Sequence, residues 1–167
     1  NLYHTNNVLQ ELKKRISNTE KPIFLFINST ETIYSIMDKL DILEQSTVFC
    51  AYNSVKNLKD KKFSQAYSDW DAAKMNKYNF LTSRFFNALD IELDFQPEVF
   101  IVTDVTMATQ SIIDPFTDTI QIIGRFRNGI TSVSHITNTD YKFQVRSKKQ
   151  LQFRINVYEE TYKTLKA

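Results

Sequence analysis

The sequence predicts an α/β protein with a mainly parallel sheet of about five or six strands and helices on both faces. Two observations carry this prediction. Several short segments are apolar at every position, as in Ile23-Phe24-Leu25-Phe26, which is typical of strands buried on both faces. Segments with apolar residues at helical spacing alternate with these runs, and this order favours strand–helix–strand units.

Length and composition fit one domain. Of the 167 residues, 42% are hydrophobic, which is enough for a sizeable core, so we expect a single domain over residues 1–167. No segment has the roughly 20 apolar residues that span a bilayer, and the N-terminus lacks a signal-peptide layout. We therefore expect a cytoplasmic protein without a membrane partner. The chain begins without Met, which favours a fragment of a longer chain; processing or removal of a tag would give the same start.

The few cysteines and histidines limit the chemistry. The one cysteine excludes an internal disulfide, and Cys50 lies in an apolar run that indicates a buried position. One cysteine and two histidines do not supply the usual ligands of a structural zinc ion, so we expect no metal site. A net charge of +2 is too small to predict a nucleic-acid partner by itself, and the lysine clusters are typical of solvated faces.

Each element of the N-terminal half follows from its apolar pattern. Residues 53–62 are polar and rich in lysine, so we expect a mobile loop there. The remaining expected elements are a helix at 6–17, a strand at 22–27, a helix at 31–44, a strand at 47–52 and a weak helix at 63–75.

The C-terminal half continues the alternation. Asp114-Pro115 is an N-cap followed by a helix-compatible proline, which predicts a helix with Ile120 and Ile123 facing the core. A capping box formed by Ser147 and Gln150 predicts a last helix, 147–167, packed on the domain. The expected elements are strands at 78–81 and 99–103, a helix at 116–123, a strand at 130–136 and an edge strand at 141–145.

Short polar side chains follow three of the predicted strands. They are Asn28-Ser29-Thr30, Thr82-Ser83 and Asp104. Because the carboxyl ends of parallel strands share one edge, where ligands bind in such sheets, we expect these residues at one edge. The alternative is that they are ordinary helix caps in polar loops.

Residues 121–129, Gln-Ile-Ile-Gly-Arg-Phe-Arg-Asn-Gly, hold both glycines of the chain and two arginines one residue apart. Helical spacing places Gln121, Gly124 and Arg125 near one face. A guanidinium is always charged and offers forked donors, which suits a phosphoryl group. The alternative is a helix-terminating glycine beside two solvated arginines.

The order of these segments, over residues 21–136, resembles the second RecA-like domain of superfamily-two DEAD/DEAH-type helicases and translocases, with motifs IV, V and VI in sequence. The resemblance implies a RecA-like domain of the P-loop NTPase type that lacks the P-loop. It implies three sets of site residues: Arg125 and Arg127 as catalytic arginine fingers, Gln121, Gly124 and Asp90 facing the nucleotide, and Asn28, Ser29, Thr30, Thr82 and Ser83 contacting nucleic acid. Two departures are Ala88 in place of the usual glycine and the one-residue spacing of the arginines, so Arg125 is the stronger candidate.

The chain has no G-x-x-x-x-G-K-[ST] loop to cradle a triphosphate. The resemblance therefore implies that ATP and Mg²⁺ are held mainly by a missing N-terminal RecA-like domain of the same parent chain, and that this chain alone is inactive. DNA or RNA is the expected partner. The rival interpretation is a non-catalytic α/β protein-interaction domain. A freestanding phosphate-binding enzyme is disfavoured by the shortage of glycine.

Overall fold

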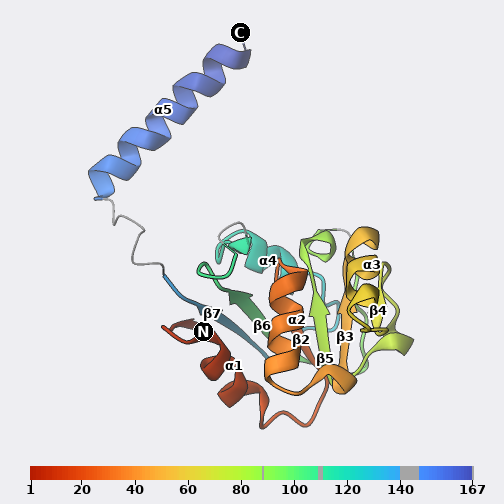
Figure 1. Ribbon diagram of the computed structural model, residues 1–167. Coiled ribbons are helices and arrows are strands. Elements are labelled where there is room, and N and C mark those ends of the chain that lie inside the picture. The colour runs from red at the N-terminus through yellow and green to blue at the C-terminus, as the bar shows by residue number, and fades with distance from the viewer. Residues whose placement is uncertain (88, 109–110, 140–146, 167) are drawn as a thin grey trace.

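The computed structural model describes residues 1–87, 89–108, 111–139 and 147–166, apart from the side chains of residues 154, 165 and 166. These residues form a seven-stranded sheet in the order β1-β7-β6-β2-β5-β3-β4, and every neighbouring pair is parallel (Figure 1). The predicted α/β fold class is confirmed, with more strands than expected. The strands are β1 (Leu2–His4), β2 (Ile23–Phe26), β3 (Ser46–Phe49), β4 (Ala66–Tyr67), β5 (Tyr78–Leu81), β6 (Glu98–Thr103) and β7 (Ser132–Thr137).

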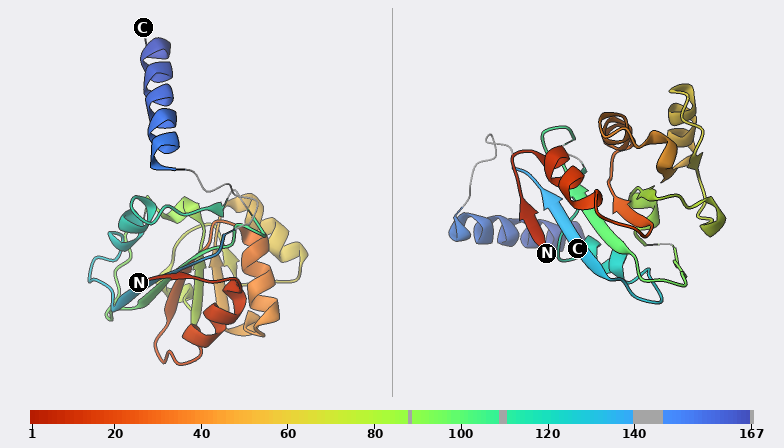
Figure 2. Two further views of the ribbon diagram at one scale, coloured as in Figure 1. Left: turned by 90° about the vertical axis from the view of Figure 1, so that its left-hand side faces the viewer. Right: turned by 90° about the horizontal axis from the view of Figure 1, so that it is seen from below.

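Helices lie on both faces of the sheet. Figure 2 shows three of them on one face: α1 (Val8–Ile16), α2 (Thr30–Lys39) and α3 (Tyr52–Asp60). The short helix α4 (Asp118–Ile123) lies on the opposite face. Three single turns, η1 (Leu43–Gln45), η2 (Ala72–Lys74) and η3 (Ser83–Phe85), complete the connections.

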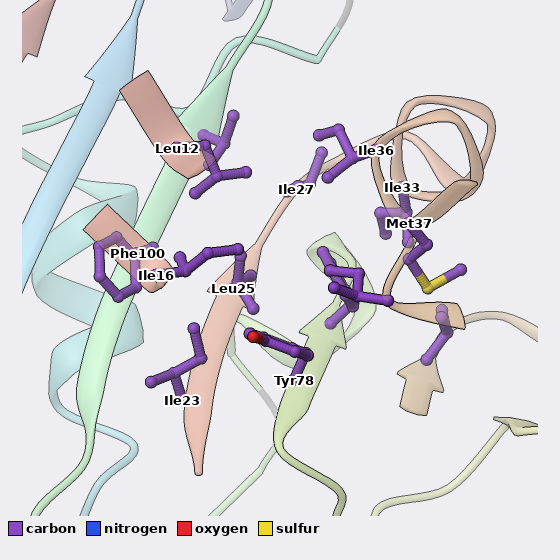
Figure 3. Packing of buried hydrophobic residues seen from close by; sticks show 14 of the residues in the cluster. Leu12, Ile16, Ile23, Leu25, Ile27, Ile33, Ile36, Met37, Tyr78 and Phe100 are labelled. Carbon is purple, nitrogen blue, oxygen red and sulfur yellow. The ribbon is translucent and has the colours of Figure 1, made fainter. Parts of the chain in front are cut away.

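The central strand β2 explains why its sequence is apolar throughout. Ile23 and Leu25 point into the cluster under α1 and α2, which Figure 3 shows from close by. Phe24 and Phe26 point into a second cluster on the face of α4. Successive side chains of a strand alternate between faces, so a strand covered on both sides has no polar position.

The region between β3 and β5 differs from the prediction. The expected mobile loop at 53–62 is helix α3, which buries only Val55 and Leu58 and turns its lysines outward. The expected helix at 63–75 is instead the edge strand β4 and the single turn η2. The first prediction was wrong because a helix on a sheet needs only a narrow apolar stripe. The second was wrong because the apolar residues at 63–75 pack in two different clusters: Ala66 of β4 lies in the first, whereas Trp70 packs against the second.

Helix α4 also begins later than expected. Asp114 Oδ1 accepts the amide protons of Phe116 at 2.8 Å and Thr117 at 2.7 Å, which closes a separate turn ahead of the helix. The buried side of α4 also differs: Ile122 is fully buried, whereas Ile120 is 66% exposed. The prediction that Ile120 faces the core was wrong. The expected edge strand at 141–145 lies outside the described residues.

Helix α5 (Lys148–Lys166) begins at the predicted capping box. The Gln150 amide donates to Ser147 Oγ at 3.3 Å, and the Ser147 amide donates to Gln150 Oε1 at 2.8 Å. Figure 1 shows α5 extending away from the sheet, and its described side chains are exposed. Packing of this helix on the domain therefore stays a prediction. Among the described residues, no helix is long and apolar enough to cross a membrane.

Candidate functional site

A groove of about 300 Å³ lies at the carboxyl ends of β2, β5 and β3, and we call it the strand-end groove. Helix α2 leaves β2 toward one face of the sheet, whereas Phe85 and Phe86, which follow β5, pack in the cluster on the other face. Connections that diverge to opposite faces open a crevice outside the strand ends. The groove is lined by Asn28, Ser29, Thr30, Glu31, Ala51, Ser54, Thr82, Ser83 and Arg84.

The structure brings together all five residues that the sequence predicted to contact nucleic acid. Asn28, Ser29 and Thr30 come from the end of β2, and Thr82 and Ser83 come from the end of β5. Sequence reasoning placed them at one edge, and they line the same groove. The alternative interpretation, that these residues are ordinary helix caps, holds for Ser29, which caps α2.

Two helices start at the strand-end groove. Helix α2 is capped by Ser29, whose Oγ accepts the Thr32 amide at 3.2 Å. Helix α3 follows Ala51, which has no side chain that could cap it. The free amides and aligned dipoles at helix starts favour an anion. Glu31 adds an opposing charge, but its carboxylate is ion-paired with Lys61.

Arg84 is a groove residue that the sequence reasoning missed. Its guanidinium is half-exposed and lies 3.6 Å from the Asp69 carboxylate, a long and solvated ion pair. Behind the groove, burial raises the pKa of the Cys50 thiol to about 11, and the Arg84 charge opposes that rise only in part. The thiol is therefore neutral. The position of Arg84, directly after Thr82-Ser83, was the signal available in the sequence.

Asp104 lies at the same edge of the sheet but outside the strand-end groove. Its Oδ1 accepts the Thr106 hydroxyl at 2.6 Å, the Asn138 side-chain amide at 2.8 Å and the backbone amides of Thr106 and Met107. Burial opposes ionisation, but these hydrogen bonds outweigh it and lower the pKa of Asp104. Asp104 thus ties together the chain segments that follow β6 and β7.

The arginine segment, residues 121–127, lies on the face of α4. Arg127 Nη2 is 2.6 Å from Asp90 Oδ1, and this hydrogen bond and charge raise the pKa of Arg127. Arg125 donates from Nε to the Gln121 carbonyl at 3.2 Å and from Nη1 to the Asn87 carbonyl at 3.3 Å. Within the described ranges, Arg125 has no carboxylate partner.

A buried side chain positions this segment. Phe126 is 5% exposed and meets Phe24 edge-on, with ring centroids 5.1 Å apart. On either side, the Ile91 amide donates to the Arg125 carbonyl at 2.8 Å and the Arg127 amide donates to the Ile91 carbonyl at 3.1 Å. The two arginines are thus anchored by the core residue between them.

The local structure does not require a glycine at position 124. A Cβ at this position would meet only the carbonyl oxygens of Ile120 and Gln121, at 3.4 and 3.5 Å. Its backbone is right-handed helical, so the conformation does not require glycine. Among the described residues, no atom comes close enough to Gly124 to exclude a Cβ at this position.

The strand-end groove and the arginine segment are separate, and residues 82–90 connect them. Thr82 lines the groove, whereas Asp90 pairs with Arg127. Between them, Phe85 and Phe86 are buried against the sheet.

His135 is a buried titratable group outside these two sites. Its Nε2 lies 3.3 Å from Thr103 Oγ1, and its Nδ1 has no partner among the described residues. Burial lowers the pKa of His135, which the nearby Asp114 charge opposes, so the ring is neutral at pH 7. The described part of the chain contains no cluster of three or more histidine, cysteine or acidic side chains suited to a metal ion.

Comparisons with protein-family models, curated proteins and solved structures found no match to this chain. The resemblance to a helicase domain therefore stays a prediction that rests on the motifs quoted above.

Proposed function

We propose that the chain is the C-terminal module of an ATP-dependent nucleic-acid helicase or translocase, and that the strand-end groove holds the phosphate backbone of a nucleic-acid strand. The observation that carries the proposal is the convergence of five hydroxyl and amide residues, two helix starts and Arg84 on one groove. The proposal includes a cytoplasmic location for this module.

The chemistry of the groove suits phosphate diesters. Hydroxyls, backbone amides and helix starts contact phosphates without reading bases, which is what a protein moving along a strand needs. Arg84 adds a forked, permanently charged donor. The groove has little net positive charge, because Glu31 lines it together with Arg84. We therefore expect weak binding that depends on salt.

The arginine segment suits a second role in the same proposal. ATP and Mg²⁺ would be held by an N-terminal RecA-like domain, because this chain has no phosphate-cradling loop. A guanidinium supplied from across a cleft stabilises charge on the transferring phosphoryl group. Arg125, bound only to carbonyl oxygens among the described residues, is the better candidate, since Arg127 is paired with Asp90.

A second candidate function, a protein-interaction domain, is favoured by a different observation. Large apolar side chains are exposed on α4 and the segment before it: Met107 (59%), Ile112 (54%), Phe116 (79%) and Ile120 (66%). Exposed apolar patches mark protein contacts. In the helicase proposal, the ATP-binding domain would cover this surface, because it borders Gln121.

The test is the salt dependence of binding to a labelled single strand, measured by fluorescence anisotropy. We expect affinity to fall as salt rises and Arg84→Ala to reduce the slope of log K against log salt by about one. Lys163→Ala, which removes an exposed charge on the remote helix α5, is the matched control and should leave the slope unchanged. Absence of binding at low salt, or equal effects of the two substitutions, would contradict the proposed groove.

A further inference from the structure

We infer that Tyr52, at the start of α3, stacks on a base of the strand whose phosphates occupy the strand-end groove. This inference rests on the proposed function, because it extends the same site from phosphates to bases. It assigns to the chain a contact that no motif quoted above contains.

Tyr52 is exposed without serving the core. Its side chain is 61% exposed, and it belongs to neither of the two apolar clusters of the sheet. A single exposed aromatic residue needs no explanation by itself, so the argument depends on where this one lies.

The position of Tyr52 ties it to the groove. It directly follows Ala51, which lines the groove. The backbone of Tyr52 is therefore next to the groove rim, within the uncapped first turn of α3. A strand whose phosphates occupy the groove would pass the start of α3, and the inference places one of its bases against this ring.

A lysine side chain makes a cation–π contact with the Tyr52 ring. Lys56, one turn further along α3, places its ammonium 4.8 Å from the centre of the Tyr52 ring. Lys59 continues the same exposed stripe at helical spacing. The stripe therefore presents an aromatic ring followed by two positive charges, the combination that binds single strands through stacking and backbone attraction.

Asn53 and Asn57, on the same exposed side of α3, are neutral. Asp60 lies one turn beyond Lys56 and next to Lys59, but no ion pair joins it to either lysine in the described part of the chain. Glu31 is ion-paired with Lys61. Every base has a flat π-face, so stacking on Tyr52 would add affinity without sequence preference, in DNA and RNA alike.

The experiment compares two labelled strands of about 12 nucleotides, one with normal bases and one fully abasic with the same number of phosphates. With normal bases, we expect Tyr52→Ala to weaken binding by about tenfold, within the range for base–aromatic stacking. We expect it to leave binding of the abasic strand unchanged. Tyr52→Phe should retain the wild-type preference, because it keeps the ring. Tyr158→Ala, which removes an equally exposed tyrosine from the remote α5, is the matched control.

The outcomes separate this inference from the proposed function. Equal losses on both strands, or no loss on the normal strand, would overturn stacking by Tyr52. If Arg84→Ala weakens both strands while Tyr52→Ala weakens neither, the phosphate groove stands and the base contact is wrong. If the wild-type chain binds neither strand at low salt, both the groove and the stacking are wrong.

Discussion

The strand-end groove and the arginine segment both carry groups suited to anions, but they differ in how those groups are occupied. In the groove, α3 starts without a side-chain cap, and the Arg84 guanidinium lies 3.6 Å from the Asp69 carboxylate and 5.9 Å from the centre of the Phe85 ring. In the arginine segment, Arg127 is held 2.6 Å from Asp90 and Arg125 is bound to two carbonyl oxygens.

This difference predicts that the groove can bind an anion as it stands, whereas the arginine segment can do so only after its arginines change partners. The groove has donors that a ligand can use directly, so its binding should depend little on rearrangement. For the proposed role in ATP hydrolysis, the arginines would have to exchange their present partners for a phosphate that a second domain brings. Their anchor, Phe126, is part of the core, so the exchange would involve the side chains rather than the backbone.

The largest effect is expected in a longer protein that carries both this chain and an ATP-binding domain. There, Arg125→Ala should lower the rate of ATP hydrolysis on the order of a thousandfold or more, because an arginine finger stabilises the transition state directly. The measurement is steady-state ATPase activity, with circular dichroism to establish that the fold is intact.

Two further variants sharpen this result. Arg125→Lys should restore little activity, because an ammonium lacks the planar fork of a guanidinium. Arg127→Ala should be milder, because Arg127 already neutralises Asp90. An inactive Arg127→Ala enzyme beside a nearly normal Arg125→Ala enzyme would reverse our assignment of the two arginines.

The next largest effect concerns the anchor of the arginine segment. Phe126→Ala should lower the free energy of unfolding by about 3–5 kcal/mol, because it removes a buried ring that packs on Phe24 and Phe26. Chemical denaturation measures the loss. Phe116→Ala removes a ring that is 79% exposed and should cost little. A comparable loss from both variants would mean that the segment is not fixed by the core.

The fold was predictable where burial alone determines the pattern. Strand β2 is covered on both faces, so its side chains must be apolar and the run is evident from the sequence. Helix α3 was missed because two buried residues suffice to hold it. The buried side of α4 was wrong because Ile120, Ile122 and Ile123 occupy both sides of this short helix, so the apolar pattern does not decide which side faces the sheet.

The groove was predictable because parallel strand ends must meet at one edge, which placed Ser29 and Thr82 together before any geometry was known. The same rule also included Asp104, whose carboxylate is instead engaged by its own loop and Asn138. Arg84 was missed because the sequence does not reveal which side chain of a short turn points to the groove.

A smaller effect tests whether the groove is built from helix caps rather than from core packing. Ser29→Ala should lower the free energy of unfolding by about 1 kcal/mol, because it leaves the Thr32 amide without its acceptor. Ser35→Ala, which removes a hydroxyl from the interior of the same helix, should cause no loss, since alanine favours helix. If Ser29→Ala were as damaging as Phe126→Ala, the contrast between the two regions would fail.

The smallest expected effect is a gain in affinity for a single strand, and it tests the long ion pair between Arg84 and Asp69. Asp69→Asn removes the carboxylate that Arg84 faces at 3.6 Å, and the freed guanidinium should raise the affinity for a single strand by about two- to fivefold, the range for an exposed ion pair. The gain should shrink as salt rises, because the competing attraction is screened. Asp38→Asn removes the same charge near the other end of α2, away from the groove, and separates release of Arg84 from a general change in net charge. If both variants gained equally, only net charge would matter. If Asp69→Asn lost affinity, the pair would position Arg84 for its ligand rather than compete with it, and the groove would then resemble the arginine segment.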